Sequence, residues 1–156
     1  MKPFTQLLMI FLLFVLLSCN HKDIRVSKDI DTLSEDINLK VKPLSVKWTF
    51  FKIGNGILGP SDYTITAIMK YSHSDWLKLY KKHQKSKEAE TGYLSKEEFL
   101  KDWYPKSVKD CFIDTGKFLK VSKTLYNVET FSKFSFIHGF CFFTDNDEVF
   151  LYTYTM

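Results

Sequence analysis

Apolar residues occupy every second position from Leu44 to Phe50, and again from Tyr63 to Tyr71. A period of two is typical of β-strands that bury one face. Glycine- and proline-containing turn signals lie between the two stretches, over residues 54–62. The pattern therefore predicts two strands joined as a β-hairpin.

The apolar period becomes helical after residue 71. Ser72 and Ser95 each stand three positions before an acidic residue, which is the spacing of a capping box at a helix start. The first helix is expected to reach about His83. The second is expected to end before Pro105, because the residue preceding a proline is pushed out of the helical region. Residues 106–112 are expected to add a helical turn or a loop.

β-type patterns return after residue 116. Residues 118–131 are expected to form one bent or interrupted strand, and residues 136–143 are apolar on both faces, as in a covered central strand. An acidic turn over residues 145–148 precedes a last strand over 149–155. The outline predicts a single α+β domain with an antiparallel sheet of about five strands, two N-terminal and three C-terminal, and two or three helices between them.

The first 18 residues have the parts of an export signal. Lys2 supplies a charged start, Leu7 to Leu17 form an apolar run of eleven residues, and the small residue Ser18 follows. The run is well short of the ~20 residues that span a bilayer, which argues against a retained transmembrane helix. An ordinary signal peptide would end in an Ala-x-Ala-like site, and none lies near residue 18.

The segment Leu16-Leu17-Ser18-Cys19 resembles the lipobox of bacterial lipoproteins. The resemblance covers only residues 1–19. It implies cleavage between Ser18 and Cys19, lipidation of Cys19 by a diacylglyceryl group, and usually a further acyl chain on the new amino-terminus. It also implies an exported protein that is anchored to a membrane of the bacterial cell envelope. Two or three acyl chains hold a protein firmly to a bilayer.

This interpretation divides the chain into three parts. Residues 1–18 are expected to be a cleaved signal peptide, and residues 41–156 to be the globular domain. Residues 19–40 are expected to be the lipidated cysteine and a polar tether, because many of their side chains are charged and few are large and apolar.

Cys111 and Cys141 remain besides Cys19. An oxidising compartment and an even count permit a disulfide between them, while two buried unpaired thiols are the alternative. Neither cysteine has a second cysteine or a histidine at metal-ligand spacing, so we expect no metal site. The glycine-rich stretch near residue 54 joins strand to strand and lacks a phosphate-binding motif, so no cofactor is expected.

Residues 20–156 contain no motif that assigns a reaction, so no catalytic residue is expected. Pairing of His138 with Cys111 or Cys141 as base and nucleophile is the alternative, since those residue types support thiol chemistry. Asp110 and Asp114 near Cys111 resemble a general acid–base pair only weakly.

Two surfaces are candidates for recognition. A basic run lies on the first predicted helix and just beyond it, which indicates a solvated helix face or a patch that contacts anionic lipid. It comprises Lys78, Lys81, Lys82, Lys85 and Lys87. Aromatic residues form 17% of the chain, enough that a row of them could cover an exposed sheet face. Tyr152 and Tyr154, with Trp48 or Tyr63 across the sheet, are the candidates for that row.

The net charge of +4 is too small to favour nucleic acid as a partner. We expect a membrane-anchored envelope lipoprotein whose domain is a non-enzymatic binding or accessory module with a protein partner in the envelope. The alternative is a small thiol-dependent enzyme or hydrolase.

Overall fold

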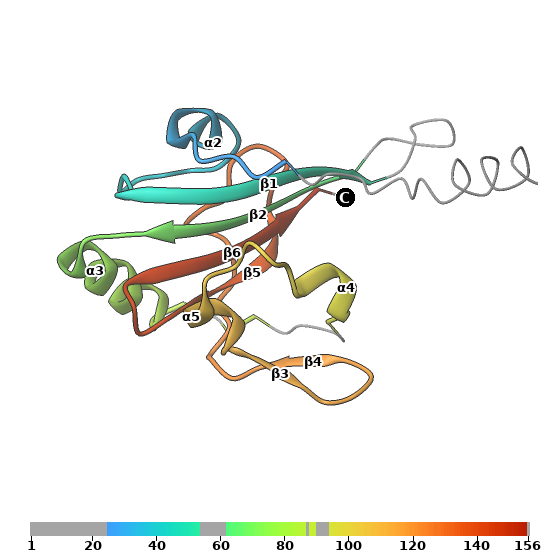
Figure 1. Cartoon of the computed structure of the whole chain (residues 1–156). Helices are drawn as coiled ribbons and strands as arrows, with labels where there is room; N and C mark the ends of the chain where they lie inside the picture. The colour runs from blue at the N-terminus through green and yellow to red at the C-terminus, as the bar shows by residue number, and fades with distance from the viewer. Residues whose placement is uncertain (1–24, 54–61, 87, 90–93, 156) are drawn as a thin grey trace, which may run out of the picture.

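The computed structural model describes residues 25–53, 62–86, 88–89 and 94–155 (Figure 1). A four-stranded sheet in the order β1-β2-β6-β5 forms the centre of the domain, and every neighbouring pair of strands is antiparallel. These strands are β1 (Ser45–Ile53), β2 (Asp62–Lys70), β5 (His138–Phe143) and β6 (Glu148–Tyr154). The predicted α+β class with an antiparallel sheet is confirmed.

The remaining elements lie on the two faces of this sheet. They are α2 (Ile30–Asp36), α3 (His73–His83), α4 (Lys96–Phe99), α5 (Lys106–Lys109), β3 (Phe112–Asp114) and β4 (Leu119–Val121). Strands β3 and β4 pair with each other as a separate two-stranded sheet. Among the described residues, no helix is both long enough and apolar enough to span a bilayer.

The alternating pattern of β1 and β2 gives the sheet two different faces. Trp48 lies opposite Ala67 in the register, whereas Thr49 lies opposite Thr66. Side chains of Val46, Trp48, Ile65 and Met69 therefore point to one face, which we call the first face. The predicted hairpin is confirmed, because β1 and β2 pair antiparallel over their full length.

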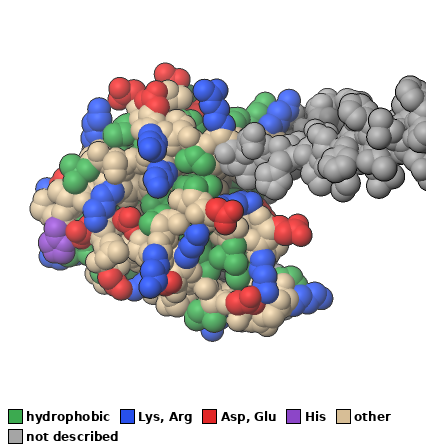
Figure 2. Space-filling view, in the orientation of Figure 1, with side chains coloured by type: hydrophobic (Ala, Val, Ile, Leu, Met, Phe, Trp, Pro, Cys, Tyr) green, Lys and Arg blue, Asp and Glu red, His purple; other side chains and the backbone are tan. Residues whose placement is uncertain are grey.

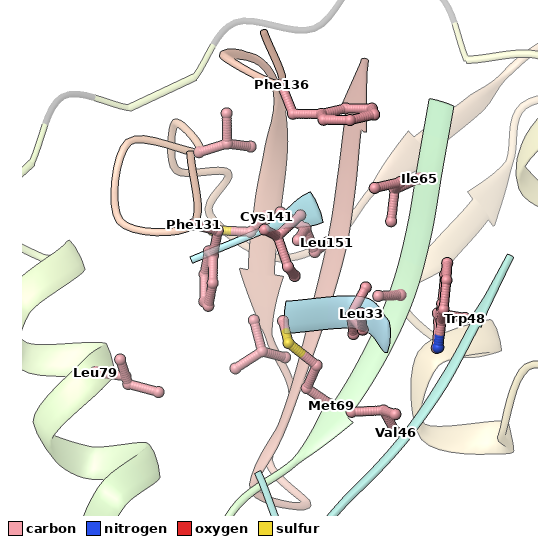
Figure 3. Close-up of a cluster of buried hydrophobic side chains, with 14 of the residues drawn as sticks. Leu33, Val46, Trp48, Ile65, Met69, Leu79, Phe131, Phe136, Cys141 and Leu151 are labelled. Atoms are coloured by element: carbon pink, nitrogen blue, oxygen red, sulfur yellow. The ribbon is translucent and has the colours of Figure 1, made fainter. Parts of the chain in front are cut away.

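The first face is covered by α2, α3 and the segment that precedes β5. Leu33 of α2, Leu79 of α3 and Phe131 join the side chains of the sheet in one buried cluster (Figure 3). Ser72 starts α3 as predicted, because its hydroxyl oxygen accepts a hydrogen bond from the backbone N–H of Asp75 at 3.2 Å.

The second face is covered by α4, α5 and the β3–β4 hairpin (Figure 1). Phe99 of α4 and Phe112 of β3 pack with Phe140, Phe142 and Phe150, which come from β5 and β6. The rings of Phe142 and Phe150 stack with centroids 4.7 Å apart. Aromatic pairs in this geometry add stability beyond the area that they bury.

The predicted polar tether over residues 19–40 is wrong from Ser27 onward. Ser27 exchanges two backbone hydrogen bonds with Trp48 at 2.8 and 2.9 Å. Helix α2 follows, and Leu33 and Ile37 are fully buried in the first-face cluster. Most of the charged residues of this segment are exposed, and Ile30 and Leu39 also pack against the cluster. Residues 1–24 lie outside the described residues, so the predicted cleavage and lipidation are not tested there.

Three other features of the elements differ from the predictions. The strand predicted over residues 118–131 is only β4, because Tyr126 instead forms isolated antiparallel bridges with Glu88 and Cys141. Strand β5 is at the edge of the sheet, although it is covered on both faces. Helix α4 ends at Phe99 and not at Pro105, while α5 confirms the predicted turn after residue 105.

His83 lies in the first-face core and is expected to make stability depend on pH. Only 1% of its surface is exposed. Its Nδ1–H donates to the backbone oxygen of Leu79 at 2.8 Å, and among the described residues its Nε2 has no hydrogen-bond partner. Burial lowers the pKa of His83 below its ordinary value of 6.5, and the charge of Lys82 acts in the same direction.

Because the unfolded chain binds this proton more readily, the contribution of neutral His83 is complete above pH 6.5 and is lost as the pH falls below it. The loss is up to about 1.4 kcal/mol per pH unit. Urea unfolding of the wild type and of His83→Leu at pH 7.5, 6.5 and 5.5 measures this term, because other groups titrate equally in both proteins. If the free energies of unfolding of the two proteins change by the same amount over this pH range, His83 does not contribute to the pH dependence.

Candidate functional site

A surface cleft lies where α3, the segment after β4 and the β5–β6 turn meet. It has two adjoining parts of about 310 and 400 Å³, and both are lined by Ser122, Lys123 and Asp145. Trp76 and Tyr80 form one wall, and Cys111 lies at the other end. Clefts of this size are in the range of ligand sites.

An ion pair divides the cleft. The ammonium group of Lys123 lies 2.9 and 2.8 Å from the two carboxylate oxygens of Asp145. The hydrogen bond that Lys123 donates to Asp145 raises the pKa of Lys123. The Asp145 side chain is 88% exposed, so solvent screens the pair and it contributes little to stability. Both groups are free to exchange this contact for one with a ligand.

The aromatic wall comes from one face of α3. Trp76 and Tyr80 are one helical turn apart and stack with centroids 5.0 Å apart. Phe143 of β5 meets both rings edge to face at 5.9 and 5.4 Å, which fixes their orientation. Both α3 rings remain partly exposed to the cleft. An apolar wall beside a charged pair can hold a peptide or another amphipathic group.

Cys111 lies at the opposite end of the cleft and is nearly buried. Its thiol donates to the backbone oxygen of Ser107 at 3.2 Å. Burial raises the pKa of Cys111, although nearby Lys123 acts in the other direction. A thiol with a raised pKa is mostly protonated near neutral pH and is a poor nucleophile.

The possible Cys111–Cys141 disulfide is not formed. Both thiols are free, and they lie on opposite faces of the sheet, Cys141 in the first-face cluster and Cys111 in the second-face cluster. The alternative interpretation, two small buried side chains, is the correct one. Cys141 is fully buried, and burial raises its pKa.

The structure does not bring His138 to either thiol. His138 begins β5 and stacks on Tyr154 with centroids 5.6 Å apart. Its side chain is on the face opposite to that of Cys141, because the two are three positions apart in one strand. Cys111 lies beside Asp145, beyond the other end of β5, and a strand of six residues spans about 20 Å.

The other candidates of the sequence occupy structural positions. Asp114 pairs with Lys96 at 2.7 Å, and Asp110 lines the cleft beside Cys111. The acidic segment 145–148 is the predicted turn between two strands. In the described part of the chain, no three His, Cys, Asp or Glu side chains are placed to hold a metal ion.

The aromatic row predicted across the sheet is not an exposed surface. Trp48 is buried, and its Nε1–H donates to the backbone oxygen of Asp29 at 2.9 Å. Tyr152 lies beneath α4, where its hydroxyl donates to the Glu98 carboxylate at 2.6 Å. The row fails because α2 and α4 cover the two faces on which these side chains lie.

The basic side chains of α3 are exposed, as predicted, at Lys78, Lys81 and Lys82. Lys78 pairs with Asp75 at 2.9 Å within the helix. On the side of the molecule seen in Figure 2, basic and acidic side chains are mixed, with apolar ones between them. This mixture favours a solvated surface on that side.

The pairing of Lys123 with Asp145 has no signature in the sequence. Lys123 lies inside the segment predicted as a strand, and its partner Asp145 is 22 positions further along the chain. Trp76 and Tyr80 were recognisable only as the apolar side of a helix. Their place at the cleft depends on how α3 crosses the end of β5.

Comparison of the chain with protein-family models, with curated protein sequences and with solved structures found no match.

Proposed function

We propose that this protein is a membrane-anchored lipoprotein of the bacterial cell envelope, with a non-enzymatic domain that binds a protein partner. The anchor is the lipobox-like segment that ends at Cys19. The site of binding is the cleft between Trp76, Tyr80 and the Lys123–Asp145 pair. The acyl chains would keep the domain at the membrane, where it meets its partner.

The observation that carries the binding role is the composition of the cleft. Partly exposed aromatic rings are fixed in place by Phe143, and a solvent-accessible ion pair lies beside them. Rigid aromatic anchors next to polar groups are typical of recognition surfaces. A thiol-dependent reaction is less well supported, because Cys111 and Cys141 have raised pKa values and both are far from His138 or on the other face of the sheet.

Lipidation is tested first, because it decides where the protein is. Cells that express the full chain are grown with a clickable palmitate analogue, and membranes are separated from soluble protein. The wild type is expected to carry the label and to sediment with membranes, since two or more acyl chains hold firmly. Cys19→Ala is expected to lose the label completely.

Ser18→Ala is the matched control, because it keeps a small residue before the cleavage site and should preserve labelling. The same cells report the binding role through a photo-crosslinking residue at Thr124 in the cleft, compared with one at exposed Ile113. A labelled Cys19→Ala chain would contradict the anchor. Identical crosslinks from both positions would contradict the cleft as the binding site.

A further inference from the structure

The chain enters the folded domain at one end of the sheet. The bridge between Ser27 and Trp48 is antiparallel, so Arg25 and Val26 run along β1 in the direction of Ile53. Arg25 therefore lies beside Phe50, toward the end of the sheet where β1 and β6 end (Figure 1). We call this the entry end.

The entry end is close to the proposed anchor in chain length. Arg25 follows Cys19 by six positions. Six residues span at most about 20 Å even when fully extended. Because the tether predicted up to residue 40 is folded, this short segment sets how far the domain can stand from a lipidated Cys19. This short reach favours the entry end as the side of the domain that faces the bilayer.

Large apolar side chains are exposed at this end. Phe50 near the end of β1 is 44% exposed, and Phe134 and Ile137, which precede β5, are 79% and 57% exposed. Phe136 joins the two groups, since its ring lies 6.4 Å from that of Phe50, and Figure 3 shows it at the end of the strands. Exposed apolar groups gathered at one end mark an interaction surface.

Phe134 also has an unfavourable backbone conformation. It lies in the tight turn from Lys133 to Phe136, with φ of 54°. The left-handed region is disfavoured for a bulky side chain and suits glycine or asparagine. Neither folding nor packing calls for phenylalanine at this position, which points to a role at the surface.

Basic groups surround the exposed apolar ones. Lys133 lies 5.1 Å from the centre of the Phe134 ring, and Arg25 and Lys52 are exposed at the same end. Two acidic groups lie among them: Asp62 begins β2, and Asp36 is close to Lys133, whose ammonium group donates to the backbone oxygen of Ser34 at 2.8 Å. The three basic groups outnumber these two. Cationic side chains around inserted aromatic rings match a bilayer surface that contains anionic lipids.

We infer that the entry end rests on the bilayer, with Phe134, Ile137 and Phe50 inserted at the level of the lipid headgroups. This inference depends on the proposed lipid anchor. It adds that the anchored domain has a fixed orientation on the membrane. The cleft beside Asp145 lies at the opposite end of β5 from Ile137, so this orientation holds the cleft away from the lipid. There it is accessible to a partner.

The test uses the full lipidated chain in vesicles of phosphatidylglycerol and phosphatidylethanolamine, with or without bromine near the headgroup end of the acyl chains. Phe134→Trp places a fluorescent reporter at the entry end. Leu44→Trp is the matched control, because Leu44 is 69% exposed at the other end of β1. Leu44 and Phe50 are six positions apart, or about 20 Å along the strand.

Brominated lipid is expected to quench the added emission of Phe134→Trp and to leave that of Leu44→Trp unchanged, since interfacial groups sit about 5–10 Å deep. If the protein floats with the vesicles but both variants respond alike, the orientation is overturned and the anchor stands. If expression of the full chain instead yields protein without a lipid on Cys19 that stays in solution, the proposed lipid anchor fails. The inferred orientation then fails with it.

Discussion

Gly139→Ala is expected to lower the free energy of unfolding by more than about 4 kcal/mol, enough to prevent accumulation of folded protein. Gly139 lies in β5 with φ of +126°. A Cβ there would be 2.0 Å from the backbone oxygen of Tyr152 and 2.8 Å from the Cα of Thr153. These atoms belong to the paired strand β6, so relief requires breaking the sheet beside the second-face core.

Gly116→Ala is the matched control. Gly116 also has a positive φ, +93°, but a Cβ there would meet nothing within 4 Å among the described surroundings. Only conformational strain is expected, of about 1–3 kcal/mol. Urea unfolding of the two variants, with folded yield as a second readout, separates backbone collision from strain. Similar small losses for both would show that β5 and β6 do not approach as closely as described.

The elements that the sequence predicts well each depend on neighbours in the chain. The β1–β2 hairpin follows from strict alternation on one buried face, and α3 follows from the Ser72 cap and one apolar stripe. The residues from 118 to 131 are different. Leu119 packs in the second-face cluster, whereas Tyr126 and Phe131 pack in the first-face cluster. In the sequence, apolar residues that pack on two different faces of the sheet look like one long strand. Only the tertiary structure shows which face each residue covers.

The surfaces were less predictable than the fold for the same reason. The aromatic content was correctly recognised, but Trp48 and Tyr152 are covered by elements distant in sequence, α2 and α4. Phe134 is exposed although no local pattern distinguishes it from a core phenylalanine. Which aromatic residue remains at the surface is decided by the packing of the two covering layers, and a single sequence does not encode this in any local period.

Leu33→Ala is expected to cost about 2–5 kcal/mol of folding free energy, the range for truncating a fully buried leucine. Leu33 has no exposed surface and packs in the first-face cluster. Helix α2 is short, so it depends on this anchor and on its cap, in which Asp29 accepts a hydrogen bond from Asp31 N–H at 2.9 Å. A polar tether would tolerate the same change without any loss.

Glu35→Ala, on the exposed side of α2, is the control and should change stability by less than about 0.5 kcal/mol. Urea midpoints of both variants decide between a folded and an extended segment. A large loss at Leu33 alone places the start of the domain near Ser27, and a chain that begins at residue 41 would then expose the first face. Equal and small losses of stability in both variants would instead support the long polar tether. The domain would then be free to turn at the membrane. The orientation proposed for the entry end therefore depends on the same leucine that fastens α2.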